Sequence, residues 1–463
     1  MGEHRLFDEY FKNVEAIEGP LLFAKRVSDI AYGATVVISS PENNIYGQVL
    51  ELTEELVVIQ VLGSTHGLQP TEIVLRYDED VFRLPVSRYM LGRVLDGKGS
   101  PIDGAPIYPA DKSKVISGSA INPVSRAVPC EYIETGVSAI DLMNTLVKGQ
   151  KLPIFSCAGL PSNELAASIV KNVASFGGEE RELVVVFAGM GITHREYSFF
   201  LEEFEKEGRL GRTVVFLNRA DEPVIERLMA PRCALTAAEH LAFELGYDVL
   251  VILTDMTHYC EALREVSSAR EEIAGRRGYP GYMYTDLASL YERTGRIIGN
   301  EGSVTQIPIL TMPDDDISHP IADLTGYITE GQIVLDRNLY KKGISPPVNP
   351  LPSLSRLMDK VAGKTTNQIH KELSDQLYSL YAASIEVRRM SELVGKDNLT
   401  ALEVSLLDFS ENFEKSFLNQ GESARSLDES ITKALQLLSK LDESLIDRMD
   451  PRHLKTYKER GAF

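Results

Sequence analysis

The sequence predicts three parts in one chain: a small antiparallel β-barrel or sandwich, a central parallel α/β domain, and a C-terminal α-helical bundle. Near the N-terminus, short β-branched runs alternate with turn residues. In the middle, continuous apolar strands alternate with helical patterns, and near the end apolar residues recur at helical spacing. A chain of 463 residues also exceeds one ordinary domain and suggests about three.

The N-terminal part, which we place at residues 1–76, has the pattern of antiparallel strands. β-Branched and other apolar residues fill 34–38, 45–52 and 56–62, and turn residues such as those at 41–44 separate the runs. Short strands at even spacing are typical of a small barrel or sandwich. We therefore expect this part to fold as a β-domain.

The central part, which we place at residues 77–351, changes to strands that are apolar throughout. Strands that are buried on both faces have this composition, so the pattern predicts a parallel sheet covered by helices on both sides. Nucleotides bind at the carboxyl ends of such strands. The predicted strands lie at 183–188, 214–217, 249–253 and 307–311.

The last part, which we place at residues 352–463, is predicted to be helical. Beyond Pro352 the only proline is Pro451. Apolar residues recur three or four positions apart, which predicts amphipathic helices. The residues with this spacing are Ile369, Leu373, Leu377 and Leu380, followed by Leu399, Leu402, Leu406 and Phe409.

The composition excludes several classes of function. Acidic residues outnumber basic ones by 67 to 48, which disfavours nucleic acid and anionic membrane surfaces as partners. No apolar run approaches the roughly 20 residues of a membrane span, and the charged N-terminus has no signal-peptide pattern. Four scattered cysteines are expected to be reduced core thiols of a cytosolic protein, namely Cys130, Cys157, Cys233 and Cys260.

Residues 156–163 occupy the place of a phosphate-binding loop, between an apolar run at 152–155 and a helical pattern at 165–170. A working loop reads GxxxxGK[ST], because its glycines allow backbone N–H groups to surround phosphate oxygens and its Lys and hydroxyl hold phosphate and Mg²⁺. All four defining positions differ here, since they hold Ser156, Pro161, Ser162 and Asn163. Pro161 in addition lacks the N–H donor that the backbone of a working loop supplies.

Other candidate sites give weaker signals. Asp255 ends an apolar strand, as a Walker B acid does, but many parallel strands end in Asp. The three acids at 314–316 could bind a cation, although a solvated turn is the interpretation we favour. The histidines lack metal-ligand spacing, and we predict no metal site. We interpret the basic pair at 276–277 as an interface or loop feature, because one pair on an acidic chain does not make a nucleic-acid surface.

Several longer segments carry a resemblance to a known family. Residues 90–104, 134–141 and 149–151 resemble the segments that open the nucleotide domain of rotary ATPase head subunits. Residues 269–287 and 350–358 are similar to the V/A-type B subunit in particular. The resemblance implies an N-terminal β-barrel, a central P-loop NTPase-like (RecA-type) domain and a C-terminal α-helical bundle.

The same resemblance implies a non-catalytic subunit. Catalytic members carry an intact phosphate loop and a glutamate that orients the attacking water. In this sequence Ile192 and Thr193 stand at the positions of that glutamate and of the arginine that follows it. An isoleucine cannot accept a proton or orient water. Two separate parts of the catalytic apparatus are therefore missing.

The residue that matches a functional position is Arg356, which corresponds to the arginine finger that the non-catalytic subunit inserts into the neighbouring catalytic site. Such a finger stabilises charge on the transferred phosphoryl group. Tyr327 and Ser355 match positions at the same interface with the A-subunit nucleotide. The alternative for Arg356 is a cap or ion pair at the start of the helical domain.

The resemblance further implies partners and a location. Three copies would alternate with three catalytic A subunits in an A3B3 head that also touches central-stalk and peripheral-stalk subunits. Mg-ATP or Mg-ADP would bind at the A/B interface and not at this chain's own phosphate loop. The complex would couple ATP synthesis or hydrolysis to H⁺ or Na⁺ transport. The chain would be cytoplasmic and would reach the membrane only through the complex.

Three alternatives from other functional classes stay open at this point. A secretion-type or other catalytic ATPase requires the Lys, hydroxyl and Glu that are absent here. A ring-shaped RNA translocase requires a basic surface, which the acidic balance disfavours. A regulatory nucleotide-binding head subunit, as in F-type enzymes, generally keeps the phosphate-loop Lys.

Overall fold

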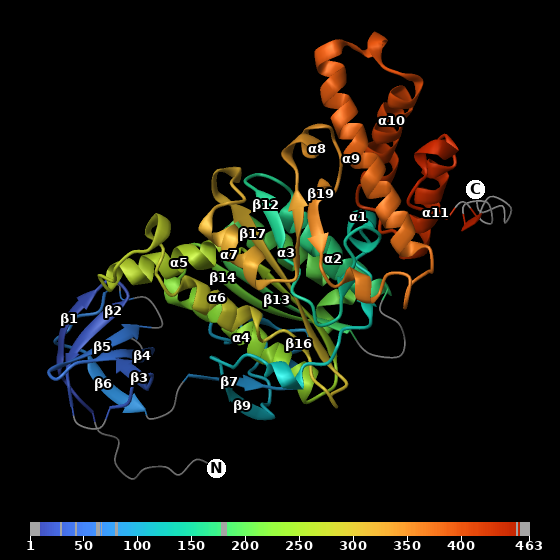
Figure 1. Cartoon of the computed structure of the whole chain (residues 1–463). Helices are drawn as coiled ribbons and strands as arrows, with labels where there is room; N and C mark the ends of the chain where they lie inside the picture. Colours follow the sequence, from blue (N-terminus) through green and yellow to red (C-terminus); the bar gives the residue numbers. More distant parts are fainter. Residues whose placement is uncertain are drawn as a thin grey trace.

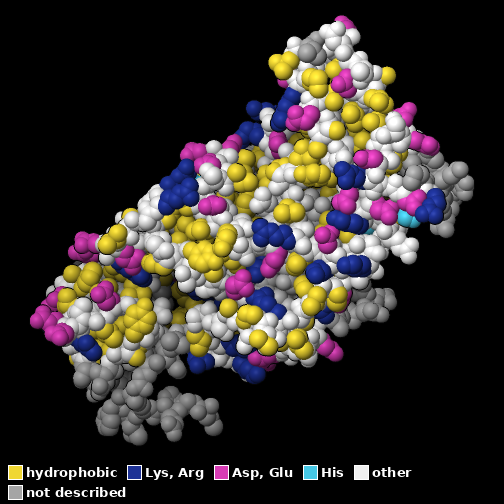
Figure 2. Space-filling model, in the orientation of Figure 1, with side chains coloured by type: hydrophobic (Ala, Val, Ile, Leu, Met, Phe, Trp, Pro, Cys, Tyr) yellow, Lys and Arg dark blue, Asp and Glu magenta, His cyan; other side chains and the backbone are white. Residues whose placement is uncertain are grey.

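The computed structural model describes residues 10–27, 30–41, 44–61, 65, 67–78, 82–176, 183–450 and 452–453. The chain forms an elongated molecule with a β-domain at one end, an α/β body in the middle and a helical domain at the other end (Figure 1). On the face that Figure 2 draws, Lys and Arg side chains are interspersed with Asp and Glu.

The N-terminal domain is an antiparallel sheet whose strands follow the order β1-β2-β5-β4-β3-β6. Backbone hydrogen bonds between Phe11 and Leu75 join the segment before β1 to β6, so the sheet closes on itself. The expected antiparallel strands are confirmed. The strands are β1 (Val14–Glu18), β2 (Leu21–Lys25), β3 (Thr35–Ser39), β4 (Asn44–Leu52), β5 (Leu56–Val61) and β6 (Val74–Asp78).

The central sheet follows the order β19-β18-β12-β17-β15-β13-β14-β8. Its pairings along this path are parallel except that of β18 with β19, and the four predicted strands fall within β13, β14, β15 and β17. The strands are β8 (Val94–Asp96), β12 (Ile154–Cys157), β13 (Leu183–Ile192), β14 (Thr213–Arg219), β15 (Asp248–Thr254), β17 (Ser303–Met312), β18 (Gly331–Leu335) and β19 (Val348–Ser355).

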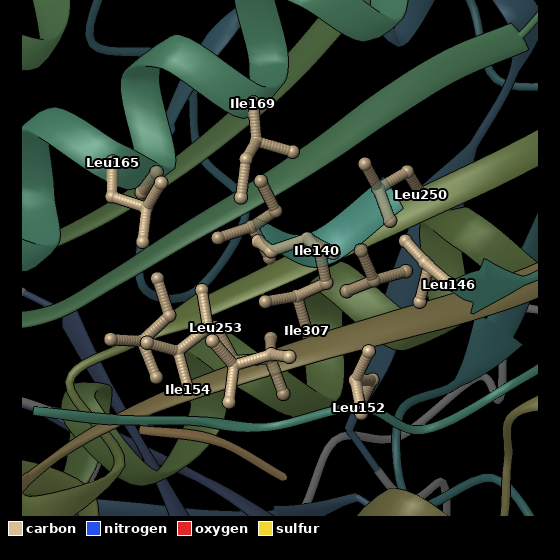
Figure 3. Packing of buried hydrophobic residues seen from close by; sticks show 14 of the residues in the cluster. Ile140, Leu146, Leu152, Ile154, Leu165, Ile169, Leu250, Leu253 and Ile307 are labelled. Atoms are coloured by element: carbon tan, nitrogen blue, oxygen red, sulfur yellow. The ribbon is translucent and has the colours of Figure 1, made fainter. Parts of the chain in front are cut away.

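Helices cover this sheet and bury its apolar residues. α2 and α3 pack on each other and on β13, while α4 and α5 pack on each other and also reach β15 and β17. Figure 3 shows Leu165 and Ile169 of α2 over the buried strand residues Ile154, Leu250 and Leu253. The helices are α1 (Ser138–Asp141), α2 (Ser162–Phe176), α3 (His194–Glu205), α4 (Val224–Phe243), α5 (Met256–Ala269), α6 (Met283–Tyr291), α7 (Pro320–Ile328) and α8 (Arg337–Lys341).

Short elements complete the central part. They are the strands β7 (Arg83–Val86), β9 (Lys112–Val115), β10 (Tyr132–Ile133), β11 (Leu146–Val147) and β16 (Gly295–Arg296), and the 3-10 helices Arg88–Met90, Pro123–Ser125, Lys206–Arg212, Arg276–Gly278 and Pro313–Asp315. Strand β16 extends the sheet by pairing antiparallel with β17.

The C-terminal domain is helical, as predicted. Side chains of Thr400 and Ser426 cap two of its helices through reciprocal bonds with a glutamate three residues later. Leu402 is 46% exposed, contrary to the predicted apolar face, because it lies in the first turn of α10 at the tip of the α9–α10 pair (Figure 1). The elements are Met358–Lys360 (3-10), α9 (His370–Val394), Lys396–Asn398 (3-10), α10 (Ala401–Asn412), Phe413–Leu418 (π-helical), α11 (Leu427–Leu438) and Glu443–Leu445 (3-10).

One detail differs from the sequence interpretation. Cys130 is exposed, whereas the other three cysteines are buried thiols; it lies in an irregular segment where its sulfur contacts Arg296. Strand β6 ends at Asp78 and β19 ends at Ser355, so both proposed domain boundaries, 76/77 and 351/352, fall inside strands. The division into those residue ranges stays a prediction.

In the part of the chain that the structure describes, no helix is long and apolar enough to cross a membrane.

Candidate functional site

A pocket of about 410 Å³ lies at the carboxyl ends of the central parallel strands, where a nucleotide binds in proteins of this architecture. The loop after β12 forms one side of this pocket, and the ends of β13, β15 and β17 form the rest. The residues that matter for phosphate binding are Ser162, Asn163, Ile192, Thr193, Glu196 and Asp255.

Part of the backbone of the loop after β12 is hydrogen-bonded within the loop itself. The N–H of Leu160 donates to the carbonyl of Cys157 at 3.1 Å, and the N–H of Ser162 donates to the carbonyl of Leu160 at 2.9 Å. Pro161, which lies between them, has no N–H. A phosphate loop depends on several convergent N–H donors, and three consecutive positions of this loop, 160–162, supply none that is free.

Side chains fill the positions where a phosphate and a metal would be held. Ser156 is buried within β12. The Asn163 amide donates to the Glu196 carboxylate at 2.8 Å. Arg337 on α8 donates from Nη2 to the Ala158 carbonyl at 2.9 Å and forms a bidentate ion pair with Asp315. The loop is therefore closed by contacts within the chain.

The acidic residues of this pocket are also engaged. Asp255 is the N-cap of α5, accepting from the N–H of Thr257 at 2.7 Å, and its other oxygen accepts from the Thr311 hydroxyl at 2.5 Å. Glu196 accepts from the N–H and the hydroxyl of Thr193 in the capping box of α3. Both carboxylates hold helix starts in place, which is a structural role.

Ile192, at the position where the resemblance implies a glutamate in catalytic members, is an apolar residue. Ile192 is buried at the end of β13, and Thr193 caps α3.

The Cys157 thiol at the end of β12 is not reactive. Burial raises the pKa of this thiol to about 11, and the negative charge of Asp315 acts in the same direction. At neutral pH this thiol stays protonated and is not a nucleophile.

A second region lies at the amino end of β18, where Arg356 follows β19. Arg356 is exposed, its N–H donates to the Glu330 carbonyl at 2.9 Å, and its Nη1 donates to the Thr329 carbonyl at 3.2 Å. Among the residues that the structure describes, no carboxylate forms an ion pair with it. A guanidinium held only by backbone carbonyls keeps its remaining donors available.

Ser355 and Tyr327, the other two residues singled out in the sequence, lie in different environments. Ser355 is buried, and its hydroxyl donates to the Thr145 carbonyl at 2.8 Å. Tyr327 on α7 is 75% exposed and lies beside Tyr284 of α6, with 6.1 Å between the ring centroids. The structure therefore places Tyr327 on the surface, two residues before Thr329, whose carbonyl accepts from Arg356, and buries Ser355.

Sequence interpretation did not assign a role to two residues behind Arg356. The amide of Gln150 donates to the Ser355 hydroxyl at 2.9 Å, and the ammonium of Lys151 pairs with Glu330 at 2.8 Å. Both belong to the segment 149–151 on which the family resemblance rests. The sequence resemblance identified this segment but gave no sign of its contacts with Ser355 and Glu330.

The remaining candidates form local contacts. Asp316 pairs with Arg277 at 2.9 Å, which agrees with a loop role for that basic residue. His319 caps α7, and burial lowers the pKa of its imidazole. Within the described ranges, no group of three or more His, Cys, Asp or Glu side chains could hold a metal ion.

Comparison with known proteins gives consistent matches along the chain. The family model described as "ATP synthase alpha/beta family, nucleotide-binding domain" matches residues 136–355, and its beta-barrel model matches 14–77. The model "C-terminal domain of V and A type ATP synthase" matches 359–458. The V-type ATP synthase beta chain of Thermus thermophilus is 53% identical over 460 residues, covering 98% of this chain and 96% of the relative.

This chain belongs to the family of V/A-type ATP synthase B subunits. The A-type ATP synthase B subunit of Methanocorpusculum labreanum is 52% identical, and the match covers 96% of this chain and 98% of the relative. A solved structure titled as the ATP synthase subunit NeqB from Nanoarcheaum equitans has a TM-score of 0.73 and 38% identity; the match covers 91% of this chain and 99% of that one. The predicted barrel, nucleotide-binding fold and C-terminal domain of the B-subunit family are confirmed.

Proposed function

We propose that this chain is the non-catalytic B subunit of a V/A-type ATP synthase or ATPase, and that Arg356 acts in trans on ATP bound to a neighbouring A subunit. The observation that carries the proposal is the state of Arg356. It is exposed, its N–H and its Nη1 donate to backbone carbonyls, and it has no acidic partner among the described residues.

The chain's own nucleotide pocket supports the non-catalytic half of the proposal. In the loop after β12, the N–H groups of Leu160 and Ser162 are bonded internally, and Arg337 donates to the Ala158 carbonyl from the side of α8. Ile192 stands where a water-orienting carboxylate is needed. A secretion-type ATPase requires all of these groups to be functional, so the autonomous enzyme is the poorer interpretation.

Arg356 has the chemistry that phosphoryl transfer requires from a second subunit. Charge accumulates on the transferred phosphoryl group in the transition state, and a planar guanidinium neutralises it with directed N–H donors. The nucleotide, its Mg²⁺ and the attacking water would be held by the A subunit. In this account the B subunit contributes charge and geometry, and the A subunit contributes the phosphate loop and the general base.

The two neighbouring residues receive different roles. Tyr327 is exposed and lies two residues before Thr329, whose carbonyl accepts from Arg356, so we assign it to the interface with the A subunit. Ser355 has its hydroxyl bonded inside the chain, so we assign it to holding the end of β19 and not to direct contact with the nucleotide. Both assignments follow from the position of each side chain relative to Arg356.

The proposal implies a larger assembly. Three B subunits alternate with three A subunits in the head, and stalk subunits connect that head to a membrane sector that moves H⁺ or Na⁺. The chain then works on the cytoplasmic side and touches the membrane only through other subunits. ATP hydrolysis or synthesis is a property of the complex.

Mixing experiments test this division of labour. Purified B chain alone should show no ATPase activity, and A chain alone should show little, because each lacks part of the site. The mixture should elute as a larger complex in size-exclusion chromatography and hydrolyse ATP steadily. Comparable ATPase activity from the B chain alone would show that it is an autonomous enzyme.

A further inference from the structure

The segment just before β12 lies directly behind Arg356. Gln150 and Lys151 are both buried, and they reach the two chain segments that meet at the arginine: the turn containing Glu330 and the end of β19. In sequence, Gln150 and Ser355 are 205 positions apart. The fold therefore brings a separate segment to the base of this side chain.

Gln150 bonds both segments through one amide group. Its Nε2 donates to the Ser355 hydroxyl at 2.9 Å and to the Glu330 carbonyl at 3.1 Å. Its Oε1 accepts from the N–H of Val147 at 2.9 Å, which fixes the orientation of the amide. The Glu330 carbonyl is also the acceptor for the N–H of Arg356. The Gln150 amide thus shares an acceptor with the Arg356 backbone.

Lys151 holds the other side of the same turn. Its N–H donates to the Glu330 carboxylate at 2.8 Å, its ammonium pairs with the same carboxylate at 2.8 Å, and the N–H of Glu330 donates back to the Lys151 carbonyl at 3.1 Å. The ammonium also pairs with Glu292 at 2.9 Å. Two carboxylates compensate the burial of this charge.

We propose that Gln150 and Lys151 are positioning residues for Arg356, acting through Ser355 and Glu330. This inference rests on the proposed role of Arg356. An arginine side chain has several rotatable bonds, so the accuracy with which its guanidinium reaches a phosphate depends on how firmly its backbone is held. A displacement of about 1 Å at a catalytic group can lower a rate by about 100-fold.

Gln150→Ala in a reconstituted A/B complex tests the inference. This change removes both hydrogen bonds to the segments that flank Arg356 and adds no charge. We expect kcat for ATP hydrolysis to fall about tenfold or more, while KM for ATP changes less than about threefold, because the nucleotide is held by the A subunit. Ser355→Ala removes one of these two bonds, that to the end of β19, and keeps the bond to Glu330; it should also lower kcat more than it changes KM.

Gln332→Ala is the matched control. Gln332 also donates its amide to a backbone carbonyl across the β18–β19 pair, that of Pro352 at 3.1 Å, but it does not contact the Arg356 turn. It should leave kcat within about twofold of the native complex. If Gln150→Ala and Ser355→Ala lower kcat no more than Gln332→Ala, the positioning role is wrong. Failure of both to assemble, while Gln332→Ala assembles, would show that Gln150 and Ser355 serve folding instead.

A double variant separates this inference from the proposed function. Adding Gln150→Ala to Arg356→Ala should cause little further loss of kcat, because the residue that Gln150 positions is already gone. If Gln150→Ala lowers kcat by the same factor with and without the Arg356 side chain, Gln150 acts independently of Arg356. Near-normal turnover of Arg356→Ala alone would instead remove the proposed function. A severe loss in Arg356→Ala with normal turnover in Gln150→Ala would reject only the positioning role.

Discussion

Arg337 donates a hydrogen bond from Nη2 to the backbone carbonyl oxygen of Ala158 over 2.9 Å. This contact joins α8 to the loop that occupies the phosphate-binding position, and the ion pair of Arg337 with Asp315 fixes the guanidinium there. The loop's backbone accepts from this cation at Ala158, and the N–H groups of Leu160 and Ser162 are bonded within the loop. Contacts within the chain therefore fix the loop on one side of the pocket.

We predict that the isolated chain does not bind Mg-ATP with a Kd below about 1 mM. Isothermal titration calorimetry on the purified chain measures this. The combined change Ser162→Lys and Asn163→Thr should not restore binding, because Pro161 and the internal N–H bonds of the loop remain. Micromolar binding to the native chain that disappears when residues 156–163 are altered would contradict this prediction.

Much of the fold follows from local sequence patterns. The strands β13, β14, β15 and β17 are apolar along their length, and this composition is specific to strands buried on both faces. Strand β19 was harder to predict because it contains Pro350 and Pro352. It tolerates them because it lies at the edge of the sheet, where one side of the strand needs no ladder hydrogen bonds.

The candidate site was only partly predictable. The altered phosphate loop and the exposed Arg356 could be found from residue types and family resemblance. The burial of Ser355 and its bond with Gln150 could not, because they depend on a contact between segments 205 positions apart. No local periodicity encodes such a contact. The closure of the loop by Arg337 likewise comes from a five-residue helix whose position only the fold determines.

Gly331→Ala should destabilise the end of the β18–β19 pair. Gly331 has a φ of +142°, and a Cβ at this position would lie 2.1 Å from the Leu354 carbonyl oxygen, a backbone atom that cannot move alone. We expect a loss of about 3 kcal/mol in the free energy of unfolding, from backbone strain and overpacking together. Urea unfolding of the purified chain measures it.

Gly343→Ala is the control for this change. Gly343 also has a positive φ, of +76°, but a Cβ there would meet no atom within 4 Å. The loss in the free energy of unfolding should be limited to about 1 kcal/mol, which is the cost of placing a residue with a Cβ in a left-handed backbone conformation. Equal losses in the two variants would mean that the approach of the Leu354 carbonyl does not matter.

Asp103→Asn should change the acid stability of the chain. The Arg93 guanidinium, which forms a bidentate pair with Asp103, lowers the pKa of that carboxyl to about 2. Because the pKa is lower in the folded state, the ionised group stabilises the fold above about pH 4, and this contribution is lost as the pH falls from about 4 to about 2.

The variant should therefore be less stable than the native chain at pH 7, and the difference should shrink toward pH 3. The midpoint of urea unfolding at each pH measures it. A difference that stays constant between pH 7 and pH 3 would show that ionisation of Asp103 is not the source of its effect.

The most direct test of the account is steady-state ATP hydrolysis by reconstituted A/B complexes that carry Arg356→Ala or Arg356→Lys, with nucleotide affinity measured in parallel. Arg448→Ala, which removes an exposed arginine paired with Asp447, is the control. We predict that both Arg356 variants assemble and keep most of their nucleotide affinity. Turnover should fall by about 10³-fold or more with Ala, and should remain poor with Lys because an ammonium lacks the planar fork. Near-normal turnover in an assembled Arg356→Ala complex would contradict the account.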